Sequence, residues 1–112
     1  MTELSTATID PAAACVTLVN VYEVEPARQA ELARLLSDLT ETSIGKQPGF
    51  VSVSVHSSLD GRHVVNYAQW ASMEDFRRFM RAPGTQDQLK RLAALATSVS
   101  PGLYRVDAVH RA

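Results

Sequence analysis

Two short strand-like segments joined by a tight-turn sequence constrain the fold of this chain more than any other feature. Residues 50–56 (FVSVSVH) alternate with a period of two, and residues 63–70 (HVVNYAQW) are rich in β-branched and aromatic side chains. Both properties are typical of β-strands. Asp60-Gly61 lies between them and is a turn signal. The sequence therefore predicts an antiparallel hairpin.

The segments on either side of the hairpin predict the remaining elements. Residues 16–22 (VTLVNVY) predict a strand, and Pro26 opens a helix in which Leu32, Leu35, Leu36 and Leu39 form one apolar stripe. Ser72, followed three residues later by an aspartate, resembles a capping box and predicts a second helix. That helix is interrupted at 82–84 and resumes its apolar period to residue 96. Residues 103–110, after Pro101-Gly102, predict a fourth strand.

The predicted order is β-α-β-β-α-β, which is the ferredoxin-like α+β fold. In this fold an antiparallel four-stranded sheet carries its helices on one face. The chain has 112 residues, the length of a single domain. Residues 1–14 show no apolar period and are expected to be a flexible N-terminal tail, which leaves 15–112 as one domain.

Composition excludes several classes of function. The net charge is −1, so nucleic acid is not an expected partner, and no apolar run approaches the roughly 18 residues that span a membrane. The first residues lack the pattern of a secretory signal, and Cys15 is the only cysteine, so a small cytoplasmic domain is expected. The three histidines lack ligand spacing and no glycine-rich loop follows a strand. We therefore expect neither a metal nor a nucleotide cofactor.

One face of the predicted sheet is rich in valine. Two helices cover only one face of a four-stranded sheet, and soluble monomers rarely leave a large apolar patch in water. The sequence therefore predicts a homodimer with the two sheets packed face to face, rather than a solvated sheet with polar residues at these positions. Alternation assigns to this face Val19, Val21, Val51, Val53, Val55 and Val65.

The other face mixes apolar and polar residues, among them Asn20, Ser52, Ser54, His56 and Asn66. A mostly apolar cavity with a few convergent polar groups is typical of a small-molecule site, and Trp70 would border it. The alternative is that these side chains bond one another or lie in water at strand ends. Strand register decides which residues share the face.

The third strand carries a resemblance to a known family. Residues 66–70 (NYAQW), the capped helix with Phe76 that follows, the Pro48-Gly49-Phe50 entry to the second strand and Asn20 resemble the antibiotic biosynthesis monooxygenase family. The likeness covers about residues 15–110. The segment 66–70 is similar to the anthrone oxygenases of aromatic polyketide pathways. Proteins of this family are dimeric α+β barrels.

The resemblance implies oxidation of a polycyclic anthrone to a quinone by O₂ without flavin, haem or metal. It implies that Asn20 and Asn66 hydrogen-bond the substrate's oxygens and stabilise its anion, and that the Trp70 indole N–H bonds the carbonyl or a peroxide. The residues expected to contact the aromatic polyketide substrate are Phe50, Ser52, Ser54, Phe76, Phe79, Leu89 and Lys90.

Two positions depart from one branch of the family, and two other functions compete with this interpretation. Phe76 stands where some members have a tyrosine, which removes a proton donor, and Lys90 stands where they have an arginine. A haem-degrading monooxygenase of the same fold needs a histidine on the second helix, and residues 72–98 contain none. A non-catalytic small-molecule-binding barrel is the alternative from a different class, because fold does not fix function.

Overall fold

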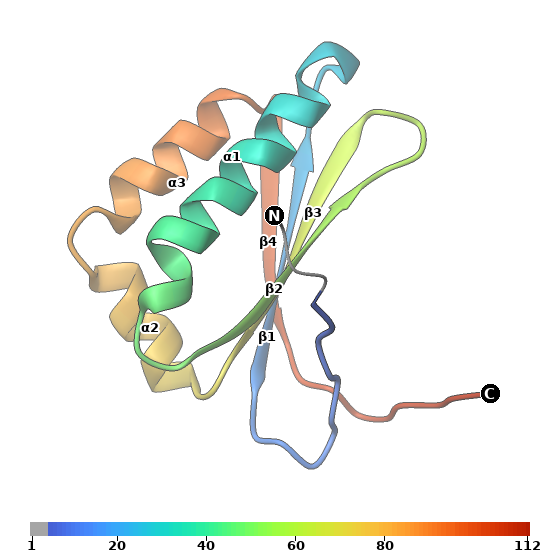
Figure 1. Ribbon diagram of the computed structural model, residues 1–112, viewed down its shortest axis with the longest axis vertical. Coiled ribbons are helices and arrows are strands. Elements are labelled where there is room, and N and C mark those ends of the chain that lie inside the picture. Colours follow the sequence, from blue (N-terminus) through green and yellow to red (C-terminus); the bar gives the residue numbers. More distant parts are fainter. Residues whose placement is uncertain (1–4) are drawn as a thin grey trace.

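Four strands form one antiparallel sheet in the order β2-β3-β1-β4 in the computed structural model, which describes residues 5–112. Figure 1 shows the helices on one side of this sheet, with the C-terminal segment on the other. The ferredoxin-like α+β prediction is confirmed. The elements are β1 (Val16–Glu23), η1 (Pro26–Arg28), α1 (Gln29–Thr42), η2 (Ile44–Lys46), β2 (Phe50–Ser57), β3 (His63–Trp70), α2 (Met73–Arg81), α3 (Thr85–Ala94) and β4 (Ser98–Tyr104).

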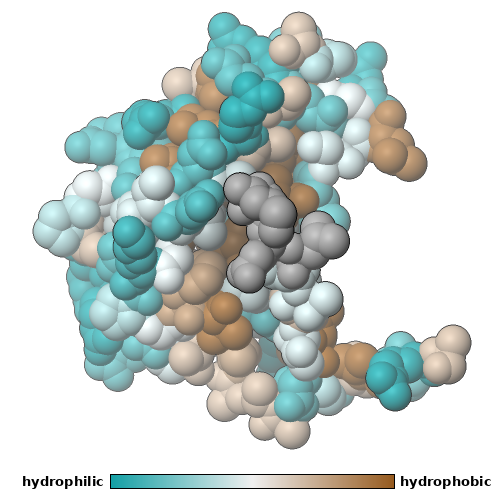
Figure 2. Space-filling model, viewed as in Figure 1, coloured by the Kyte–Doolittle hydropathy of each residue, from teal (hydrophilic) through white to brown (hydrophobic). Residues whose placement is uncertain are grey.

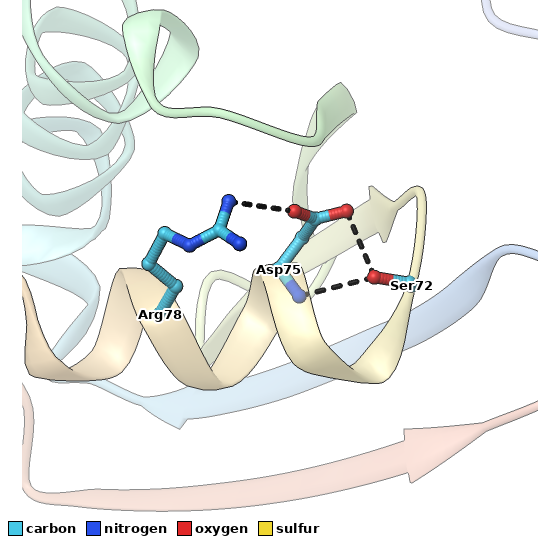
Figure 3. Close-up of polar contacts among 3 residues, drawn as sticks. All are labelled: Ser72, Asp75 and Arg78. Carbon is cyan, nitrogen blue, oxygen red and sulfur yellow. Dashed lines mark hydrogen bonds and ion pairs between the residues drawn. The ribbon is translucent and has the colours of Figure 1, made fainter.

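The helices lie where the apolar spacing and the capping residues predict. Leu32, Leu36 and Leu39 of α1 are buried against the sheet. Ser72 caps α2: its hydroxyl oxygen accepts a hydrogen bond from the Asp75 backbone N–H at 3.1 Å, and the hydroxyl donates to the Asp75 carboxylate at 2.8 Å (Figure 3). The same carboxylate pairs with Arg78 one turn later. Gly84, with φ of 85°, separates α2 from α3.

A β-bulge at Val51 corrects the predicted faces of the second strand. Phe50 pairs with Trp70, but Ser52 already pairs with Gln69, so β2 holds one extra residue there. Because side chains alternate, an extra residue moves every later side chain to the other face. Val53 and Val55 therefore lie under the helices and pack against the core. Ser52, Ser54 and His56, which alternation had placed there, lie on the opposite face.

The fourth strand begins earlier than predicted. The sequence predicted residues 103–110, whereas β4 runs through Pro101 and Gly102 and ends at Tyr104. Pro101 pairs with Asn20, and among the strands of the described residues β4 has only β1 as a neighbour. A proline is tolerated there because the backbone of an edge strand has one side free of ladder hydrogen bonds.

The face of the sheet without helices carries Val19, Val21, Val65 and Tyr67, all half-buried. Part of the segment that precedes β1 lies against this face: the Gln69 side chain donates to the carbonyl oxygen of Thr8 at 3.1 Å. Residues 1–4 of the expected tail lie outside the described residues. Figure 2 shows a hollow on this side, between the β2–β3 hairpin and the C-terminal segment. Among residues 5–112, no helix is long and apolar enough to cross a membrane.

Candidate active site

A cavity of about 250 Å³ lies between the sheet and the helices. It is close to the lower end of the range of about 300–1,000 Å³ that is usual for small-molecule pockets. Every major element contributes to its wall, which is mostly apolar. The lining residues are Leu18, Asn20 and Tyr22 of β1, Leu36, Ile44, Val53, then Asn66, Ala68 and Trp70 of β3, Phe76, Phe79 and Met80 of α2, Leu89, Leu92 and Ala93 of α3, and Val99 and Pro101 of β4.

Three polar atoms in the wall of this cavity are buried and have no hydrogen-bond partner among residues 5–112. Asn20 and Asn66 are opposite each other in the β1–β3 register, and their side-chain oxygens accept no hydrogen bond. The Trp70 Nε1–H likewise has no acceptor, although the residue is only 1% exposed. Among the described residues, the one other such side-chain atom is the hydroxyl oxygen of Thr17. Unpaired polar groups thus gather at this cavity.

Aromatic rings hold Trp70 in place. The Phe79 ring stacks on the indole with centroids 4.6 Å apart and an interplanar angle of 22°. Phe50 and Phe76 approach it edge-on, at 5.7 Å and 6.4 Å. Two of these phenylalanines belong to α2, so the Ser72 cap that starts the helix also positions this wall. Three aromatic rings therefore pack around the indole in the cavity wall.

The turn before β2 packs against the start of α2. Gly49 has φ of 81°, a conformation that favours glycine, and a Cβ there would collide with the Asp75 carboxylate. The Ala71 N–H donates to the Gly49 carbonyl at 2.8 Å. The Pro48-Gly49 turn therefore packs directly on the first turn of α2.

Tyr22 lines the cavity but is not among the site residues predicted from the sequence. It is 2% exposed and lies two residues beyond Asn20, on the same face of β1. Burial raises the pKa of its phenol above the usual value of 10.0, and hydrogen bonding to Asn20 acts in the opposite direction. The signal in the sequence was the alternation that places Asn20 and Tyr22 together.

The structure brings together six of the ten predicted site residues and places four elsewhere. Phe50 lies behind the wall, in contact with Trp70, and does not border the cavity. Ser52 and Ser54 are on the other face of the sheet, where the Ser52 hydroxyl donates to Gln69 at 2.7 Å. Lys90 is exposed on α3. Those that line the cavity are Asn20, Asn66, Trp70, Phe76, Phe79 and Leu89.

The chemistry of this site is hydrogen bonding in an apolar enclosure. Within residues 5–112, no group of three or more histidine, cysteine or carboxylate side chains is placed to hold a metal ion. Amides and an indole N–H are poor nucleophiles and poor bases, but they bind carbonyl, hydroxyl and oxyanion groups. An oxyanion bound in a low-dielectric site gains more from such donors than it would in water.

Comparison with known proteins identifies the family. The model of the antibiotic biosynthesis monooxygenase family matches residues 15–91. The chain belongs to this family. It is 50% identical over 80 residues to the tetracenomycin-F1 monooxygenase of Streptomyces glaucescens, and the match covers 71% of each chain.

Two solved structures of Streptomyces oxygenases have the same fold. The ActVA-Orf6 monooxygenase of Streptomyces coelicolor, solved in complex with nanaomycin D, superimposes with a TM-score of 0.80 at 29% identity. That match covers 92% of this chain and 96% of the other. A mutant of SnoaB, a cofactor-independent oxygenase from Streptomyces nogalater, gives a TM-score of 0.77 at 28% identity, with 87% and 97% covered. The family resemblance seen in the sequence is confirmed.

Proposed function

We propose that this protein is a cofactor-independent monooxygenase that oxidises a polycyclic aromatic polyketide of the anthrone type to a quinone with O₂. One observation carries the proposal: an aromatic-walled cavity in a chain of this family is bordered by three buried polar atoms that have no partner, on Asn20, Asn66 and Trp70. A buried polar group without a partner costs about 1–3 kcal/mol, and a ligand that supplies the missing bond recovers it.

The unpaired atoms indicate the chemistry of the ligand. The Trp70 N–H requires an acceptor such as a carbonyl oxygen. The side-chain oxygens of Asn20 and Asn66 can accept hydrogen bonds from hydroxyl groups. If the side-chain amide rotates by half a turn, its nitrogen donates a hydrogen bond at the same place instead. A flat aromatic molecule with carbonyl and phenolic groups meets all three requirements, and its rings suit the phenylalanine wall.

Such a substrate supplies most of its own reactivity. The carbanion of an anthrone is delocalised over its fused rings, so the negative charge that develops on its carbonyl oxygen lies where the asparagine amides donate. One donor of this kind contributes about 2.7–4 kcal/mol to the transition state. The carbanion passes an electron to O₂, the two radicals combine as a peroxide, and loss of water leaves the quinone. One oxygen atom of O₂ enters the product and the other becomes water.

The relatives support the reaction class. A tetracenomycin-F1 monooxygenase, an ActVA-Orf6 monooxygenase holding nanaomycin D and a cofactor-independent oxygenase are all similar to this chain. The last of these supports the expectation that no cofactor is needed. The haem-degrading alternative requires a histidine on the second helix to bind iron, and residues 72–98 contain no histidine.

The proposal includes a homodimer formed through the sheet face that carries no helix. Val19, Val21 and Val65 share that face, which would leave apolar side chains in water on a monomer. The cavity lies between the sheet and the helices of one chain, so a second copy on the opposite face leaves it intact.

The proposal is tested by oxygen consumption with dithranol, a simple anthrone, and purified protein treated with a chelator. Oxygen uptake and quinone formation should exceed the rate with heat-denatured protein, and should rise with pH as more substrate ionises. Trp70→Phe keeps an aromatic ring and deletes the N–H, so its turnover should be slower. A requirement for added flavin or iron contradicts the proposal. Tight binding without oxygen uptake favours the non-catalytic barrel.

A further inference from the structure

Among residues 5–112, Tyr22 is the one lining residue whose side chain titrates within the pH range accessible in water. The other polar lining groups are two asparagine amides and an indole, and in the described part of the chain no carboxylate, histidine, lysine or arginine contributes to the wall. The phenol of Tyr22 is therefore the one group that the described residues place in this wall to transfer a proton to or from a bound substrate. Phe76 also lines the cavity and has no hydroxyl.

The position of Tyr22 places its phenol next to the asparagine pair. Asn20 and Tyr22 are two positions apart on one face of β1, a distance of about 7 Å along a strand. The strand neighbours of Tyr22 are Val64 and Val99, both apolar. The phenol is thus enclosed by hydrocarbon, with the Asn20 amide as its polar neighbour.

We infer that Tyr22 is a further catalytic residue, the acid that protonates the peroxide formed from the substrate and then, as tyrosinate, the base that completes the oxidation. This inference rests on the proposed function. It assigns to the chain's own phenol a proton transfer that neither Trp70 nor Phe76 performs.

The transfer balances with groups that are already present. The substrate's methylene carbon first loses one proton to water, and its carbanion combines with O₂ to give a peroxide anion. Tyr22 gives its proton to the terminal peroxide oxygen. Tyrosinate then removes the second hydrogen from the same carbon, the electron pair of that C–H bond forms the C=O bond, and the O–O bond breaks. The hydroxide that leaves takes up the first proton and becomes water, while Tyr22 regains its hydrogen.

The acidity of Tyr22 fits this order of events. A phenol with the usual pKa of about 10 already holds its proton at neutral pH, and burial raises the pKa of Tyr22 further, so the group begins the cycle as an acid. It becomes a base only after giving that proton to the peroxide. A strong base in the free cavity is therefore not needed, because the first proton leaves an already acidic substrate.

The first test compares Tyr22→Phe with the control Tyr104→Phe, which removes the same hydroxyl from an exposed tyrosine of β4 outside the cavity. With dithranol, Tyr22→Phe should lower kcat about a hundredfold, as expected for a general acid–base group, and leave KM within about threefold. A substrate–O₂ adduct should accumulate in a single turnover, as mass spectrometry would show. Tyr104→Phe should behave as wild type.

A second measurement does not depend on the folding of the Tyr22 variant. The chain has three tyrosines, so Tyr67→Phe/Tyr104→Phe leaves Tyr22 as the one phenol that ultraviolet absorbance follows. Its ionisation should occur above pH 10, and a bound anthraquinone should raise the midpoint further because the phenol donates to a ligand oxygen.

The outcomes separate this inference from the proposed function. If wild-type protein turns over the anthrone and folded Tyr22→Phe has a kcat within twofold of wild type, the role of Tyr22 is overturned. The monooxygenase proposal then remains intact. A Tyr22 titration that the quinone does not shift also overturns it. Wild-type protein that never consumes oxygen with an anthrone overturns both.

Discussion

Three residues of this cavity are distinguished by polar atoms that lack a hydrogen-bond partner among the described residues. In most folded proteins buried polar side chains find a partner within the chain, and the exceptions call for a physical explanation. Here Asn20, Asn66 and Trp70 each leave a polar atom unpaired at one cavity, while Thr17 is isolated on the other face of the sheet. Convergence of three such atoms at one cavity is the pattern expected of a binding site.

Asn66→Ala tests whether one of these amides acts on the transition state. Its oxygen has no partner in the fold, so removing it leaves no new unpaired group and the melting temperature should change little. The substitution should lower kcat about a hundredfold with a smaller change in KM, because the charge it binds grows as the carbanion forms. Asn20→Ala should act in the same direction with a smaller effect. An unchanged kcat in folded Asn66→Ala would exclude this residue from the mechanism.

At the scale of elements, the sequence was a better guide to which strands and helices form than to the face of the sheet on which each residue lies. Strict alternation correctly grouped Asn20 with Tyr22 and Asn66 with Trp70, because β1 and β3 pair without interruption. It failed after Val51, since one bulge exchanges the faces of the rest of β2. Bulges depend on pairing with a distant strand, which local periodicity does not contain.

The boundary of β4 was missed for a related reason. Pro101-Gly102 is a break signal when only the local sequence is considered. At the edge of a sheet the missing N–H of a proline is tolerated, so the strand continues through it. Only the order of the strands shows that β4 is an edge.

The start of α2 offers a prediction at this scale. Ser72→Ala removes the side chain that caps the helix carrying Phe76 and Phe79. Loss of an N-cap costs about 1 kcal/mol, which for a domain of this size lowers Tm by about 4 °C. Ser37→Ala, at an exposed position inside α1, is the matched control and should not lower Tm. Melting is monitored by circular dichroism, and equal Tm values for the two variants would show that the cap does not stabilise the protein.

The whole molecule is organised by the two faces of its sheet. One face and the helices enclose the cavity, and the other presents Val19, Val21 and Val65 to a second copy in the proposed dimer. The bulge places Val53 on the cavity side of the sheet, so a substitution of Val53 would not probe the dimer interface. Val19 lies on β1, a central strand, and on the proposed interface.

Val19→Asp should dissociate the dimer, because it would bury an unpaired charge between the two sheets. Light scattering should give twice the chain mass for wild type and the monomer mass, or unfolded protein, for the variant. Leu59→Asp makes the same change at a fully exposed position in the β2–β3 turn and should remain dimeric. A wild-type protein that is monomeric at micromolar concentration would contradict the proposed assembly.

The indole of Trp70 reports directly on whether the unpaired polar atoms of the cavity bind the oxygens of an aromatic polyketide. The chain has one tryptophan, so a ¹H–¹⁵N spectrum contains one indole N–H signal and its assignment is unambiguous. Addition of an anthraquinone should move this proton downfield as the free N–H gains a carbonyl acceptor. A saturating quinone that leaves the signal unchanged would contradict the account.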